Sequence, residues 1–183
     1  MENIYHDLRY ARAMLRLYQW ESFYVIVGSS AAALTGLQFV VVALGAEVDS
    51  LRDASAVAAF GTPTVVHFCG VLTIAALIAV PGQTPITLGC FFVTLGIAGV
   101  IYTMVTARRA KRQAHYEPVF EDWLWHVGLP LVSYTVLLIT GASTFRYPTA
   151  ALYAVAAVAL ALLFIGIHNA WDSAVYISTR GRE

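Results

Sequence analysis

Three histidines are placed where they could bind a metal ion or transfer protons: His67, His126 and His168. Asp122 precedes His126 by four residues, and Asp172 follows His168 at the same spacing. Side chains four residues apart lie on one face of a helix, where they can contact each other or share an ion. Imidazole and carboxylate are ligands for zinc or non-haem iron, two histidines can bind a haem, and the same groups transfer protons near neutral pH.

The same residues also have a structural interpretation. A histidine near a helix end that is hydrogen-bonded to an aspartate one turn away needs no ligand. His67 is harder to explain in this way, because it lies about one turn or more inside an apolar segment, where an ionisable side chain suggests function. No HExxH or CxxC motif supports a metal site. A metal ion or haem, a proton- or ion-coupled role and a structural role therefore all stay open.

A second polar set belongs to one broad helix face of an apolar segment, with Thr35 and Gln38 on the face and Ser30 at its margin. An amide in hydrocarbon needs water or another helix as its partner. Small and polar residues at this spacing more often indicate helix packing than a pore. In a ring of subunits, however, they would line the axis, with Glu47 and Asp49 at its mouth.

A basic cluster follows the third apolar segment and consists of Arg108, Arg109, Lys111 and Arg112. Basic residues next to a membrane attract anionic lipid headgroups by about 1 kcal/mol each. The cluster therefore predicts binding of anionic lipids. The alternative is that this loop binds an anion or a regulatory partner.

The composition indicates what must position these groups. Of the 183 residues, 59% are hydrophobic and 12% are charged, and eleven basic residues balance eleven acidic ones. A soluble domain has about 25% charged residues, so this chain has too few to cover a soluble surface. The zero net charge argues against a nucleic-acid partner. These values exclude a soluble enzyme, a disordered tail and a disulfide-rich secreted scaffold, and they indicate a membrane protein.

Five segments are long and apolar enough to cross a bilayer, which takes about 20 residues of helix. They are residues 23–44, 62–80, 85–105, 127–144 and 149–168, and none contains Asp, Glu, Lys or Arg. We therefore predict an all-α integral membrane protein with five transmembrane helices. The proline- and glycine-containing stretches at 81–85 and 146–148 are expected to be tight turns between antiparallel helices.

The first twenty residues have a different pattern. Apolar residues recur there at helical spacing, while Arg9, Arg12 and Arg16 form a separate stripe. This pattern predicts an amphipathic helix that lies at the membrane interface, or alternatively one that packs on a partner subunit. The expected organisation is an interfacial helix at 1–20, a single five-helix domain at 21–176 and a polar tail at 177–183.

The membrane orientation follows from the loops, because cytoplasmic loops carry an excess of Lys and Arg. With five spans, the loops at 45–61 and 106–126 share a side with the C-terminal tail, and this side carries more basic residues than the other. We therefore expect an N-terminus outside and a C-terminus inside a bacterial cytoplasmic membrane.

Three classes of function fit this organisation. The first is a homo-oligomeric ion channel or small-solute transporter. The second is an accessory or scaffold subunit of a membrane complex. The third is a membrane-embedded metal- or haem-binding protein that uses His67, His126 and His168. The sequence has no glycine-rich phosphate loop and no nucleophile elbow, so enzymatic catalysis is not expected. The expected partners are the lipid bilayer, anionic lipids and further copies of the chain.

Overall fold

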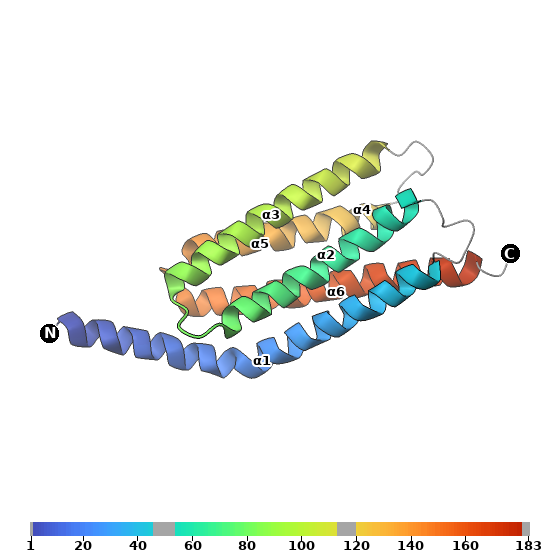
Figure 1. Cartoon of the computed structure of the whole chain (residues 1–183). Coiled ribbons are helices and arrows are strands. Elements are labelled where there is room, and N and C mark those ends of the chain that lie inside the picture. The colour runs from blue at the N-terminus through green and yellow to red at the C-terminus, as the bar shows by residue number, and fades with distance from the viewer. Residues whose placement is uncertain (1, 46–53, 113–119, 181–183) are drawn as a thin grey trace.

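The computed structural model describes residues 2–45, 54–112 and 120–180, and these residues are helical except at two turns, 80–84 and 144–147 (Figure 1). The elements are α1 (Glu2–Gly45), α2 (Ala54–Ala79), α3 (Pro85–Arg112), α4 (Phe120–Trp123), the π-helix η2 (Leu124–Gly128), α5 (Leu129–Ser143) and α6 (Pro148–Arg180). The segments α4, η2 and α5 follow one another directly and together form a single long helix.

Among the described residues, five helices are long and apolar enough to cross a membrane, which confirms the number and order of the predicted segments. Their apolar stretches are Tyr18–Leu44, Thr62–Ala79, Pro85–Arg109, Leu124–Ser143 and Pro148–Val175. Four stretches run further than predicted at one end or both, and three of them contain charged residues that the prediction had placed outside, such as Glu21 and Asp172. A charged residue interrupts the apolar sequence but not the helix, because the backbone hydrogen bonds continue past it. The helical stretches therefore extend beyond the uncharged segments of the prediction.

The first helix is continuous across the predicted boundary between an interfacial helix and the first span. Its N-terminal part extends past the turn at 80–84 and away from the other helices (Figure 1). Residues 2–20 and the first span therefore form one helix rather than two. Their location at a membrane interface stays a prediction.

The five long helices form one bundle in which α1 and α3 lie on opposite sides of the others (Figure 1). Helix α2 packs on α1 and α6, and α5 packs on α3 and α6. We call the end that holds the turns at 80–84 and 144–147 the turn end. The other end holds the C-terminal part of α6, and we call it the C-terminal end.

Local chemistry explains the turn between α2 and α3. Gly82 has a φ of 77°, a backbone conformation that other residues rarely adopt. The Gln83 side chain donates from Nε2 to the Leu77 carbonyl at 2.9 Å and accepts from the Thr87 hydroxyl at 2.9 Å. Helix α3 then begins at Pro85, where the missing N–H is not needed. The turn therefore holds α2 and α3 antiparallel, as predicted.

Glycines allow the helices to approach closely. A Cβ atom at Gly28 would lie 2.7 Å from the Cβ of Ala75, and one at Gly166 would overlap the ring of Phe68. On the other side of the bundle, a Cβ at Gly99 would overlap the ring of Tyr134. These contacts fix which residues of neighbouring helices lie opposite one another.

The interior of the bundle is apolar over most of its length. Phe68, Val71 and Ile74 of α2 pack there against Leu137 of α5 and Leu162 of α6, all with no exposed surface. Burying side chains of this size against one another removes apolar surface from the surroundings and excludes voids. This core separates the C-terminal end of the bundle from the turn end.

We predict that Gly99→Ala destabilises the protein by about 1–3 kcal/mol, because the added methyl group must displace the ring of Tyr134. The matched control is Gly36→Ala in α1, where nothing lies within 4 Å of an added Cβ. Thermal unfolding in detergent, followed by circular dichroism, measures both variants. Equal melting temperatures for the two variants would contradict the close packing of α3 on α5.

Candidate functional site

His67 is buried in the middle of the bundle, with 1% of its surface exposed. It lies on α2, one turn after Pro63, and its Nδ1 is 3.1 Å from the hydroxyl oxygen of Tyr134 on α5. Tyr134 is also buried, with 2% exposed. Either group can donate the hydrogen bond, depending on the tautomer of the imidazole. The predicted functional histidine therefore has a tyrosine as its direct partner, a residue that the sequence analysis did not consider.

Two glycines make room for this tyrosine. A Cβ at Gly70 of α2 would lie 3.2 Å from the Tyr134 hydroxyl, and Gly99 of α3 lies against the ring. A Cβ at Gly99 would overlap the ring, whereas one at Gly70 would require the Tyr134 hydroxyl to move by a few tenths of an ångström. The absence of a side chain at Gly99 therefore allows Tyr134 to reach His67.

Several buried polar atoms near His67 have no hydrogen-bond partner among the described residues. They are Nε2 of His67, Nε2 of Gln38 on α1 and both amide atoms of Asn169 on α6. Gln38 is 2% exposed and Asn169 is 1% exposed. Most buried polar groups in proteins are hydrogen-bonded, so such a group suggests a bound water, an ion or a functional role. Three helices thus each carry a buried side chain with at least one unpartnered polar atom.

The helix contacts place these side chains at one level of the bundle. Gly28 lies against Ala75 of the antiparallel helix α2, and Gln38 is about 15 Å further along α1, opposite about residue 65. Gly166 lies against Phe68, and Asn169 is about 5 Å further along α6, again opposite about residue 65. Gln38 and Asn169 thus lie at the level of the turn of α2 that includes His67. We call Gln38, His67, Tyr134 and Asn169 the buried polar cluster.

The π-helix η2 places His126 near this cluster. The backbone N–H of Leu129 bonds to the carbonyl of Leu124, one residue further back than in an α-helix. Pro130 has no N–H and clashes with the carbonyl four residues before it, which explains why the helix widens at this point. His126 lies in the widened segment, close enough to His67 for an electrostatic interaction.

The same segment also contacts His168. The ring of Trp125 stacks on the ring of His168 with centroids 3.8 Å apart and an angle of 20° between the planes. On its other side, His168 Nε2 is 3.2 Å from an Asp172 carboxylate oxygen. His168 is 26% exposed and Asp172 is 54% exposed, so the pair lies at the edge of the bundle. Titratable groups therefore extend from this edge inward to His67.

The structure also bears on the predicted metal ligands. Within the described ranges, no group of three or more His, Cys, Asp or Glu residues is placed to hold a metal ion. The side chain of Asp122 lies outside the described part of the chain, so its pairing with His126 stays a prediction.

The structure places three of the predicted pore residues, and their lining of a pore stays a prediction. The Ser30 hydroxyl donates to the Ile26 carbonyl and the Thr35 hydroxyl to the Ala31 carbonyl, both at 2.8 Å, so each returns its hydrogen bond to its own helix. Gln38 lies inside the single chain, rather than on an outer face where an axis between subunits would run. The predicted mouth residues, Glu47 and Asp49, lie outside the described residues.

The basic cluster lies at the C-terminal end of the bundle, at the end of α3. Arg108, Arg109 and Lys111 are exposed, and the ammonium group of Lys111 lies 5.5 Å from the ring centre of Trp123. The side chain of Arg112 lies outside the described residues. These positions leave the exposed cations accessible, and their binding of anionic lipids stays a prediction.

We predict that Gln38→Met and Asn169→Leu each raise stability by about 1 kcal/mol, because each removes an unpartnered buried amide at similar side-chain volume. In a domain of this size, that corresponds to about 2–4 °C in melting temperature. The matched control is Gln83→Met, which should lose stability because both amide atoms of this buried glutamine are hydrogen-bonded. If all three variants lose stability equally, the two amides have partners.

Comparisons with known proteins add no functional information. No protein-family model, curated protein or solved structure matches the chain. The function must therefore be argued from the buried polar cluster and its surroundings alone.

Proposed function

We propose that this protein is an integral membrane transport protein that conducts protons through the interior of its own helix bundle. The membrane location is supported by the five long apolar helices and by their apolar outer faces. Large apolar side chains are widely exposed on the outside, such as Ile26 at 65%, Ile86 at 70% and Ile139 at 62%. An apolar surface of this extent is unfavourable in water and suits contact with lipid.

The observation that carries the proposal is the set of unpartnered polar atoms in the buried polar cluster. Inside a membrane, a polar group without a partner is unfavourable by several kcal/mol, and ionisable residues there commonly serve a transport path. Gln38, His67 and Asn169 bring such atoms to one level from three helices. Water molecules that enter this level during conduction would supply their missing hydrogen bonds and would connect the imidazole to a proton source.

The chemistry of the neighbouring groups favours protons over a larger solute. An imidazole can accept a proton on one nitrogen and release one from the other. The proposed path begins at the bundle edge with His168 and Asp172. It continues through His126 in η2 to the hydrogen-bonded pair of His67 and Tyr134. The path thus leads inward from the C-terminal end.

The apolar core closes this path toward the turn end. Phe68, Val71 and Leu137 are fully buried there and offer no polar group to a proton. We therefore propose gated conduction, in which the helices rearrange before a proton passes this layer. The π-helix η2 is suited to such a change, because π-segments have weaker constraints than α-helices and occur often at functional sites.

The remaining parts of the proposal follow the sequence analysis. We propose that the chain lies in a bacterial inner membrane with its N-terminus outside, so that the histidine-rich C-terminal end faces the cytoplasm. Arg108, Arg109 and Lys111 would bind anionic lipids on that side. Homo-oligomers are also proposed, although the path described above runs within one chain and needs no axis between subunits.

The test is proton flux into liposomes that contain the purified protein and a trapped pH-sensitive dye, with the membrane potential set by potassium and valinomycin. We expect flux in the wild type and none above protein-free liposomes for His67→Phe, which removes the innermost imidazole. Asn169→Leu should also abolish flux, and because we expect it to be more stable, misfolding would not explain its loss.

Thr94→Val is the matched control, because Thr94 is exposed on α3 and bonds only to its own helix through the Cys90 carbonyl. It should conduct like the wild type. Unchanged flux in His67→Phe would overturn the assignment of the path. Absence of flux in the wild type would overturn proton conduction, and a tightly co-purifying membrane protein would then favour an accessory role.

A further inference from the structure

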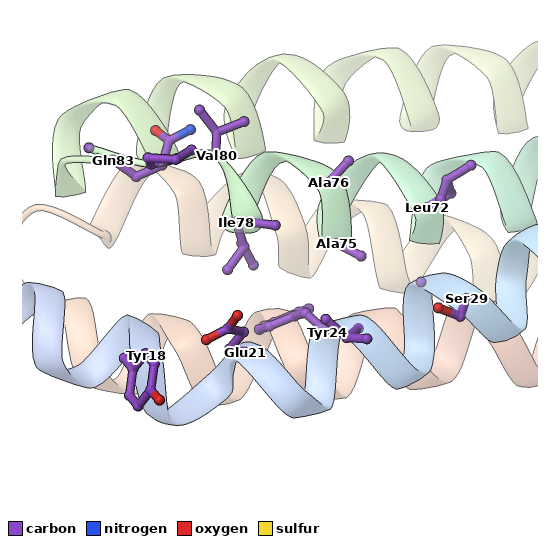
Figure 2. A pocket seen from close by; sticks show the side chains of 15 residues that line it. Tyr18, Glu21, Tyr24, Ser29, Leu72, Ala75, Ala76, Ile78, Val80 and Gln83 are labelled. Carbon is purple, nitrogen blue, oxygen red and sulfur yellow. The ribbon is translucent and has the colours of Figure 1, made fainter.

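A groove of about 540 Å³ lies between α1 and α2 near the turn end, and no residue of the buried polar cluster lines it (Figure 2). Its walls are mainly small and apolar, and they include Val25, Gly28, Leu72, Ala75, Ala76 and Ile78. The small residues leave a trough where larger side chains would fill the space between the helices. This volume lies within the usual range for a small-molecule site, about 300–1,000 Å³.

Glu21 is the one charged side chain among the described residues that line the groove. It extends from α1 toward Ile78 of α2, and it lies between Tyr18 and Tyr24 along the helix (Figure 2). Glu21 lies about one helical turn after Tyr18, the residue at which the apolar stretch of α1 begins. A carboxylate in an otherwise uncharged trough favours a cationic group over an anionic one.

The groove is accessible from the side of the bundle. Val25 is 56% exposed and Leu72 is 39% exposed, so their outer surfaces would face lipid in the proposed membrane. From Glu21 to Ser29, helix α1 rises about 12 Å, which gives the length of the apolar trough beyond the carboxylate. A ligand that fits both features has an apolar chain and, at one end, a cationic group.

We propose that this groove binds one acyl chain of a membrane phospholipid whose headgroup carries a primary ammonium, with the ammonium donating hydrogen bonds to the Glu21 carboxylate. An anionic headgroup would bring like charges together, and a quaternary ammonium has no N–H to donate. Such a lipid reaches the groove laterally from the bilayer. The inference rests on the membrane location in the proposed function and is independent of proton conduction.

The test is native mass spectrometry of the full-length, delipidated protein in detergent, with added phosphatidylethanolamine, phosphatidylcholine or phosphatidylglycerol of identical acyl chains. We expect the wild type to retain phosphatidylethanolamine about tenfold better than phosphatidylcholine. The reason is that only the primary ammonium can donate a charge-assisted hydrogen bond to Glu21. Glu21→Gln should remove this preference. Glu121→Gln, which removes the same charge from an exposed position in α4, should keep it.

A second variant tests the trough itself. Ala76→Phe leaves Glu21 in place but fills the groove, and it should abolish retention of the lipid. Equal retention of the three lipids, or an unchanged preference in Glu21→Gln, would overturn the inference. If Ala76→Phe instead converts a dimer into a monomer, the groove is an interface between copies of the chain.

These outcomes are separate from those of the flux assay. A protein that retains the lipid but conducts no protons would uphold the groove assignment and overturn proton conduction. A protein that is recovered outside the membrane fraction of the cell would overturn the membrane location, and the groove inference with it.

Discussion

The close approach of helices at glycine residues determines how the rest of this structure is arranged. Gly28 against Ala75 and Gly166 against Phe68 set the register of α1 and α6 relative to α2. Because each helix is rigid along its length, a contact in the apolar middle also decides which residues meet further along. The register brings Gln38 and Asn169, far apart in the sequence, to the level of His67.

The bundle therefore divides into regions with different chemistry. Two pairs of titratable groups lie on the C-terminal side of the apolar core, His168 with Asp172 at the edge and His67 with Tyr134 in the interior. An apolar layer that includes Ile74 and Leu162 separates them from the turn end. Near the turn end, the groove between α1 and α2 is open to the side and contains a single carboxylate. The proposed proton path and the proposed lipid site are thus separated by packed apolar side chains.

The π-helix shows how one residue changes the position of several side chains. Pro130 cannot donate a hydrogen bond into the preceding turn, so the backbone widens over Leu124–Gly128. The extra residue in this turn affects the direction of Trp125 and His126, which interact with His168 and His67. Sequence periodicity could not reveal this, because it assumes a constant number of residues per turn. The available signal was Pro130, just inside the fourth apolar segment, which the sequence analysis did not use.

The sequence by itself determined the helical class, the number and order of the apolar helices and the turns between them, because these depend on local hydropathy and on proline and glycine. It also indicated that His168 and Asp172 share a helix face, since that spacing is local. Tertiary structure alone decided that Gln38 is interior, that Tyr134 is the partner of His67 and that Asn169 belongs to the cluster. Those relations depend on the rotation and register of packed helices, which are set by contacts between distant residues rather than by the sequence around each one.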